Sequence, residues 1–306
     1  MFYAAGPDTW EYSATSNVFE HNTNVYDRNA YYYVHLKNEA GKRIKSLPLS
    51  EKEKTTEITS FDDYAIVEDE NYNLIGSGRR WLGDKYDFTT SYTYNFDFEN
   101  LVLGSQAFLR AKVVARSNSN SSFDFMYSEQ DLGNISIRKI PTGSYPAYAY
   151  DNTFEKYFEL SKDNLLDIQL KYNRPTANAI AWLDFIEINV KRELIFNGEL
   201  LNFRALESVG IGNVSDFTIR ETSSDTRLWD ISDFPEVGSL TTQFIENRSQ
   251  FKVETSTLRE FMAFTPEMAY SPTFVELASN QNLHAIENTE LLIVRPESFI
   301  DQANEL

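Results

Sequence analysis

An alternation of apolar and polar residues with a period of two is the feature that most constrains this fold. In Tyr92–Phe98 four aromatic residues share one face, and Thr, Asn and Asp take the other. Leu166–Tyr172 alternates in the same way, and Trp182–Leu194, Phe108–Ala115 and Tyr31–Leu36 are further candidate strands. Such one-sided alternation is typical of antiparallel sheets with one face toward solvent. Many short strands of this kind predict a mainly β fold, an antiparallel β-sandwich or jelly roll.

The pattern divides the chain into three stretches. Residues 1–200 hold the longest alternating runs, and we expect them to form one jelly-roll-like β-sandwich domain. Residues 201–265 hold shorter candidate strands, which form either a small β-module or strands that return to the sandwich. The Ser- and Asn-rich stretch Ser117–Ser122 lies between two candidate strands, and we expect it to be a long hairpin loop.

The third stretch, residues 266–306, changes in character. Ser271–Ala278 begins with Ser-Pro, which predicts an N-cap and the first turn of a short helix. Leu291–Val294 is wholly apolar, as in a strand buried on both faces of a parallel sheet. An amphipathic helix is expected from Phe299. A strand followed by a helix is half of a βαβ unit, so we expect the first strand and helix of a truncated α/β domain.

Composition excludes several classes of function. The chain has 28 basic and 46 acidic residues, a net charge of −18, whereas nucleic acids and anionic membranes attract basic surfaces. No apolar run approaches the roughly 18 residues of a transmembrane helix. The residues after Met1 lack a basic region and a long apolar region, so we expect no signal peptide. Cysteine is absent, which removes disulfides and any Cys nucleophile from this chain. The many aromatic residues and the Asn-, Ser- and Thr-rich loops favour an extracellular location.

Local motifs do not identify a reaction. Val209–Ser215 contains Gly-x-Gly but lacks the third glycine of a dinucleotide-binding loop, and Gly76–Arg80 is more typical of a tight turn than of a phosphate site. His21, His35 and His284 are far apart and lack metal-ligand spacing. No G-x-S-x-G nucleophile motif occurs. We therefore assign no catalytic, cofactor-binding or metal-ligating residue, and no cofactor.

Two further groups of residues leave alternatives open. The acidic clusters Asp62–Asp63 and Glu68–Asn71 could ligate Ca²⁺, although a solvated surface is favoured. Several tyrosines could stack on sugar rings, although packing in the core or across strands is favoured. These tyrosines are Tyr31, Tyr33, Tyr145, Tyr148 and Tyr150.

Several motifs stand in series along the chain. Phe2–Trp10 ends in Gly-Pro-x-x-Trp, Gly78–Asp84 reads Gly-Arg-Arg-Trp-Leu-Gly-Asp, and Trp182–Asn189 reads Trp-Leu-Asp-Phe-Ile-Glu-Ile-Asn. Asn280–His284 reads Asn-Gln-Asn-Leu-His and precedes Leu291–Val294. Between the first two motifs lie His21, Tyr31–Tyr33 and Gly41–Ile44. In this order the segments resemble the PorU-type, gingipain-like cysteine endopeptidases, the sortase family of the type IX secretion system in Bacteroidetes.

The resemblance implies the β-rich region that precedes the peptidase domain, followed by the first strand and helix of that domain. The family's catalytic Cys and His belong to the peptidase domain, so neither is carried over, and His284 does not match the catalytic histidine. Asp84 stands where the family usually has Glu.

By this resemblance the chain is a non-catalytic scaffold or docking surface. The whole enzyme removes C-terminal secretion signals from cargo proteins at the cell surface, on the extracellular face of the outer membrane. Its implied partners are the cargo proteins and an outer-membrane β-barrel protein of the secretion system. The alternative, based on the acidic, aromatic-rich and Cys-free composition, is a free-standing extracellular β-sandwich that binds carbohydrate or protein.

Overall fold

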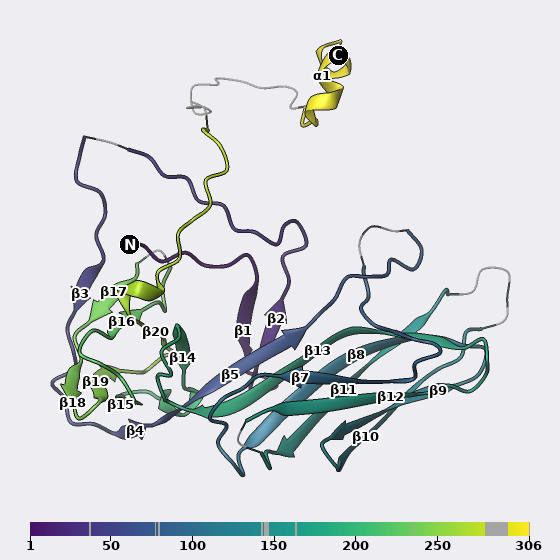
Figure 1. Cartoon of the computed structure of the whole chain (residues 1–306), viewed down its shortest axis with the longest axis horizontal. Helices are drawn as coiled ribbons and strands as arrows, with labels where there is room; N and C mark the ends of the chain where they lie inside the picture. Colours follow the sequence, from purple (N-terminus) through teal and green to yellow (C-terminus); the bar gives the residue numbers. More distant parts are fainter. Residues whose placement is uncertain are drawn as a thin grey trace. The chain divides into compact units, whose positions relative to one another are not determined.

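A computed structural model describes residues 1–36, 38–76, 78, 80–141, 143, 147–162, 164–234, 236–278 and 293–305. The fold is mainly β, as predicted. It divides into two compact units, Met1–Tyr31 with Lys37–Ala269 and Tyr32–Leu36 with Tyr270–Leu306. All strands that the structure describes belong to the larger unit (Figure 1).

The larger unit is organised around a ten-stranded sheet in the order β11-β8-β13-β5-β14-β20-β16-β17-β3, with β6 paired to β13. Its neighbouring strands are antiparallel apart from the parallel pair β17 and β3. The strands are β11 (Tyr150–Glu159), β8 (Gln106–Arg116), β13 (Ile180–Glu193), β5 (Ser60–Val67), β14 (Leu201–Arg204), β20 (Glu260–Phe264), β16 (Arg227–Asp230), β17 (Gly238–Leu240), β3 (Lys45–Leu47) and β6 (Lys85–Tyr86).

Three smaller sheets complete the unit. One four-stranded sheet contains, in spatial order, β10 (Gln130–Ile137), β9 (Ser121–Tyr127), β12 (Leu166–Asn173) and β7 (Ser91–Phe96). A second contains β18 (Gln243–Ile245), β19 (Arg248–Glu254), β15 (Val214–Arg220) and β4 (Thr56–Ile58), with β4 parallel to β15. The third is a hairpin of β1 (Thr9–Ser13) and β2 (Val18–Asn22).

The two largest hydrophobic clusters of the described residues lie against the ten-stranded sheet. In the first, Phe125 and Ile168 of the β10-β9-β12-β7 sheet cluster with Leu109 of β8. In the second, the rings of Phe217 and Phe251 stack 4.9 Å apart and pack on β14 and β20. One long sheet is thus shared by two sandwiches (Figure 1), which confirms the predicted antiparallel β-sandwich class. Strands from residues 201–265 contribute both to the long sheet and to the second sandwich.

The long alternating runs form strands where the sequence predicts them. In β7, Tyr94 and Phe96 are buried while Thr93 and Asn95 are exposed, as expected for a sheet with one solvated face. In β13 that expectation is wrong, because residues on both faces are buried. The β1–β2 hairpin, together with Leu74 and Leu82, covers the second face, which we call the outer face.

Two other expectations are corrected by the structure. Tyr31–Leu36 forms no strand, since this stretch is exposed and no ladder pairs with it among the described residues. The Ser117–Ser122 stretch is not a hairpin loop. Strand β8 belongs to the ten-stranded sheet and β9 to a four-stranded sheet, so the chain crosses between the layers of the sandwich here.

The C-terminal expectations have mixed outcomes. Ser271–Ala278 carries no helix; its residues are exposed, and so short a helix is unstable unless it packs on another surface. Within Leu291–Val294, the first two residues lie outside the described ones, and the last two have no regular structure. The predicted final helix is present as η4 (Glu297–Phe299) and α1 (Ile300–Asn304). Two more 3₁₀ turns are η1 (Leu206–Ser208) and η2 (Pro266–Met268).

No helix that the structure describes is both long enough and apolar enough to cross a bilayer.

Candidate functional site

The outer face of β13 is where three of the motifs meet. The β1–β2 hairpin lies on it through the side-chain amide of Asn189, whose Oδ1 accepts from the Phe19 backbone N–H at 2.7 Å. The Nδ2 of the same amide donates to the Phe19 carbonyl at 2.9 Å. One polar side chain of β13 thus satisfies both backbone groups of a residue in β2, as a neighbouring strand would.

A chain of charges stands beside this amide. Glu187 of β13 is 1% exposed, and its Oε1 lies 2.7 Å from Nε of Arg110 on β8. Arg110 also contacts Glu20 of β2, with Nη1 and Oε2 3.0 Å apart. Burial raises the pKa of Glu187, whereas the Arg110 guanidinium opposes that rise. A buried carboxylate needs a partner, and the Glu187–Arg110 pair supplies it within the ten-stranded sheet. The Arg110–Glu20 pair joins the sheet to the hairpin.

Aromatic rings close the other side of the hairpin. Trp10 of β1 stacks on Tyr64 of β5, with ring centroids 4.0 Å apart. The guanidinium of Arg204 of β14 also lies over the Tyr64 ring, 4.5 Å from its centroid. Burial raises the pKa of Tyr64 to about 12, so this phenol stays neutral in its apolar setting.

Of the three histidines, the structure brings His21 into this assembly. Its ring nitrogens lie 3.7 Å from a carboxylate oxygen of Asp8 and of Glu68. His35 is exposed in irregular chain, and His284 lies outside the described residues. Within the described part of the chain, no group of three or more His, Asp or Glu side chains could hold a metal ion.

The Gly78–Asp84 motif pairs directly with the Trp182–Asn189 motif. The Gly83 N–H donates to the Leu183 carbonyl at 2.8 Å, and the Leu183 N–H donates to the Asp84 carbonyl at 3.0 Å. Arg80 forms ion pairs with Asp184 at 2.7 Å and with Asp151 at 3.0 Å. These ion pairs and hydrogen bonds hold the Gly78–Asp84 motif against β13.

The remaining candidates from the sequence have structural roles or lie apart. The Asp62 carboxylate accepts the Leu206 N–H at 2.6 Å, and Asp63 pairs with Arg192 at 2.7 Å. The Gly210–Gly212 stretch is a turn before β15, as predicted, with Gly212 at a φ of 79°.

Of the five tyrosines proposed for sugar stacking, the structure describes four. Tyr31 and Tyr33 are exposed in irregular chain, and Tyr145 lies outside the described residues. Tyr148 and Tyr150 lie beneath the guanidinium groups of Arg116 and Arg138, 4.1 and 3.8 Å from the ring centroids.

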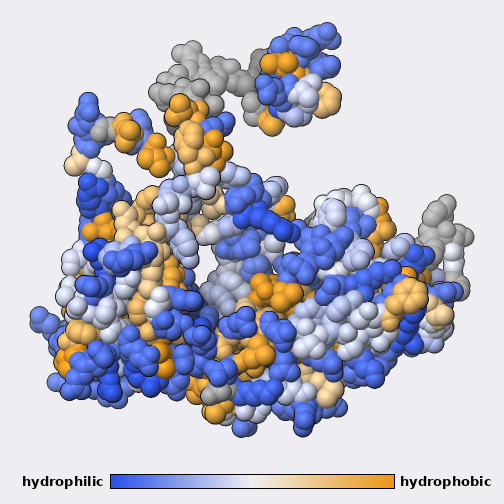
Figure 2. Space-filling model, in the orientation of Figure 1, coloured by the Kyte–Doolittle hydropathy of each residue, from blue (hydrophilic) through white to orange (hydrophobic). Residues whose placement is uncertain are grey.

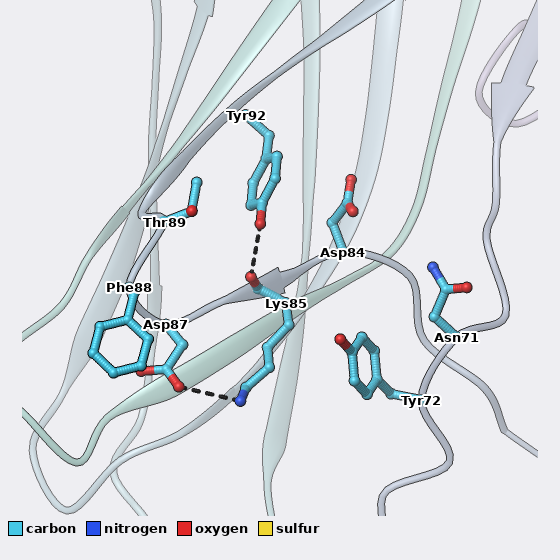
Figure 3. Close-up of a pocket in the computed structure, with 8 residues that line it drawn as sticks. All are labelled: Asn71, Tyr72, Asp84, Lys85, Asp87, Phe88, Thr89 and Tyr92. Atoms are coloured by element: carbon cyan, nitrogen blue, oxygen red, sulfur yellow. Dashed lines mark hydrogen bonds and ion pairs between the residues drawn. The ribbon is translucent and has the colours of Figure 1, made fainter.

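A pocket that sequence reasoning missed lies beside β6 and the start of β7 (Figure 3). Its volume is about 300 Å³. The rings of Phe88, Tyr72 and Tyr92 lie around Lys85. The lining residues are Asn71, Tyr72, Asp84, Lys85, Asp87, Phe88, Thr89 and Tyr92. Asn71, Asp84 and Tyr92 each belong to a segment that the sequence singled out, but Tyr72 and Phe88 are single aromatic residues in short connections and carry no periodic signal.

No family model and no curated protein matches the chain. Among solved structures, the dimeric latent form of PorU from Porphyromonas gingivalis matches with a TM-score of 0.78 and 19% sequence identity. The match covers 94% of this chain, which spans 28% of the length of that PorU chain.

Two other structures match more weakly. The CBM36-1 domain of a multidomain xylanase from the hindgut metagenome of Trinervitermes trinervoides has a TM-score of 0.27 and 15% identity, covering 41% of this chain and 96% of that domain. The insecticidal delta-endotoxin Cry8Ea1 from Bacillus thuringiensis has a TM-score of 0.25 and 18% identity, covering 35% of this chain and 19% of the toxin. Such low TM-scores carry no argument. The chain therefore has the fold of a PorU-like β-rich region, which confirms the predicted resemblance at the level of the fold.

Proposed function

We propose that this chain is the non-catalytic scaffold and docking region of a PorU-like sortase of the type IX secretion system. The observation that carries the proposal is the fold match to PorU across 94% of the chain. The absence of cysteine is consistent with it, since a thiol nucleophile would have to come from another part of such an enzyme. The whole protein would act at the cell surface and remove C-terminal secretion signals from cargo proteins.

The rigid part of the scaffold is the ten-stranded sheet with its attached hairpin. Asn189 fixes β2 on β13 through two hydrogen bonds, and the ion pair between Arg110 of β8 and Glu20 of β2 joins the hairpin to the sheet. Contacts of this kind specify one position for the hairpin, because any other position leaves buried polar groups without partners. A fixed framework is what a domain that orients a peptidase or holds a partner requires.

Exposed apolar side chains of the smaller unit support the docking role. Within it, Phe274, Val275 and Leu277 are exposed, and so are Tyr33 and Leu36. Figure 2 shows hydrophobic residues gathered along the 270–278 segment. Exposed apolar side chains in such density are typical of a surface that another domain or protein covers. We infer that the peptidase part of the enzyme covers these residues.

The test uses the full-length protein in the bacterium that encodes it. Deleting the gene should leave C-terminal signals on secreted proteins, read by mass spectrometry of their C-terminal peptides, and the wild-type gene should restore their removal. The double variant Phe274→Ser/Leu277→Ser should restore less removal at equal protein level. Ile211→Ser is the matched control, because Ile211 is 101% exposed in a turn of the larger unit.

Unchanged processing in the deletion strain would exclude the secretion function altogether. Normal processing by the double variant would exclude only the docking role of the 270–278 segment. Thiol-dependent peptidase activity of the 306-residue chain alone would contradict the non-catalytic assignment.

A further inference from the structure

Phe88 stands out in the pocket of Figure 3. Its side chain is 96% exposed, although it lies in the short connection between β6 and β7. Tyr72, at 42% exposed, lines the same pocket. Large aromatic rings exposed to solvent at the mouth of a concave site are typical of ligand contacts, since a ligand that covers them buries their apolar surface.

The chain beside Phe88 is held firmly, so the ring does not owe its exposure to a loose loop. Asp87 forms ion pairs with Arg174 at 2.8 Å and with Lys85 at 3.1 Å. Arg174 Nη1 also donates to the Asp87 carbonyl at 3.0 Å, and the Asp87 N–H donates to the Thr89 carbonyl at 3.1 Å. These contacts present Phe88 as a fixed platform.

One polar group of the pocket lining is held in place by buried residues. The Asp84 carboxylate accepts a hydrogen bond from the Tyr94 hydroxyl at 3.0 Å. That buried hydroxyl lies 3.0 Å from the hydroxyl of Tyr86, which is fully buried. By contrast, the Asn71 amide and the Thr89 hydroxyl have no hydrogen-bonding partner among the described residues. The pocket thus combines one positioned acceptor with two groups that are open to a ligand.

We propose that this pocket binds a neutral carbohydrate, with a pyranose ring stacked on Phe88. The apolar C–H face of a pyranose matches a flat aromatic ring, and its hydroxyls match the Asp84 carboxylate, the Asn71 amide and the Thr89 hydroxyl. Asp87 is already neutralised by Lys85 and Arg174. With Asp84 and Asp87 against Lys85 and Arg174, the charges around the pocket sum to zero, which favours a neutral sugar over a charged one. The site is independent of the proposed secretion function.

The experiment applies the intact 306-residue chain to an array of neutral and acidic glycans, followed by calorimetric titration with the best soluble oligosaccharide. Binding to neutral glycans is expected. Phe88→Ala should raise Kd by about tenfold or more, equivalent to about 1.4 kcal/mol. Phe88→Trp should keep binding, because it retains a flat ring. Asn71→Ala should weaken binding without lowering the unfolding midpoint.

Phe88→Leu separates stacking from simple hydrophobic contact. It should bind as poorly as Phe88→Ala if a sugar ring stacks there, whereas a hydrophobic peptide would tolerate it. Ile211→Ala is the control for loss of an exposed apolar side chain elsewhere. The proposal is overturned if the array shows no neutral glycan bound, if Phe88→Ala or Phe88→Leu binds like the wild type, or if a peptide panel binds in place of glycans.

Discussion

Replacing Arg110 by alanine tests the buried ion pair between β8 and β13, beside the point where the β1–β2 hairpin meets the sheet. Its partner Glu187 is 1% exposed, with the two charged atoms 2.7 Å apart. Removing the cation leaves a buried carboxylate alone, and breaking one side of a buried pair costs about 3–5 kcal/mol. Against a total stability of about 5–15 kcal/mol, this loss is large. It should appear in urea unfolding at pH 8 as a lower midpoint with a similar slope.

The loss should depend on pH in a defined direction. Burial already raises the pKa of Glu187, and without Arg110 the opposing influence disappears. The folded variant then binds a proton more readily than its unfolded chain, so its stability falls as pH rises above the unfolded value of 4.5. The variant should therefore lose less stability relative to the wild type at pH 5 than at pH 8, where Glu187 must remain ionised or take up a proton.

Two controls separate the pair from its surroundings. Glu20→Gln removes the more exposed partner of Arg110 and should cost at most about 1 kcal/mol. Arg110→Met/Glu187→Leu removes both charges and should recover most of the loss, because no buried charge is left alone. A loss below about 1 kcal/mol for Arg110→Ala at pH 8, or a loss that does not change with pH, would refute the reasoning.

Three further predictions follow from other parts of the larger unit. Asn189→Ala should cost about 1–3 kcal/mol, because two backbone groups of β2 lose their partners, and limited proteolysis should then cut the hairpin sooner. Phe217→Ala should cost about 3–5 kcal/mol in urea unfolding, because Phe217 is fully buried in the second core. Burial raises the pKa of Tyr64 to about 12 and also raises the pKa of Tyr86 and of Tyr94. These phenols ionise first in the unfolded chain, so thermal unfolding should show stability falling above pH 10, by about 1.4 kcal/mol per pH unit for each tyrosine.

The sequence predicts best those strands that have one buried and one wet face. In Tyr92–Phe98 and Leu166–Tyr172 the alternation follows the burial pattern directly. The prediction fails at Tyr31–Leu36, where a similar pattern finds no strand to pair with. Alternation reports that a segment could bury one face; it does not report that a partner exists.

Coverage of the second face of a sheet lies beyond what periodicity can predict. In β13 the polar residues Glu187 and Asn189 read as a solvent-facing side, yet the hairpin more than 160 residues earlier supplies their partners. The same limit applies to the pocket. Asp84 and Phe88 lie near each other in the sequence, whereas Asn71 does not. Asn71 reaches the pocket because its backbone N–H donates to the Leu82 carbonyl at 2.8 Å.

Three of the motifs that carried the resemblance meet at one strand, β13. Trp10 and His21 belong to the hairpin that lies on β13, and Gly83 and Asp84 hydrogen-bond to Leu183 within it. Gly83 fits this place closely, because a Cβ there would lie 3.2 Å from the Asp69 carbonyl oxygen. Segments that meet on one central strand constrain one another, so a series of weak motifs can mark a fold more surely than any one of them. By the same argument these motif residues hold the strands of the region together. A ligand is better sought at side chains that have no structural partner among the described residues, such as the exposed ring of Phe88.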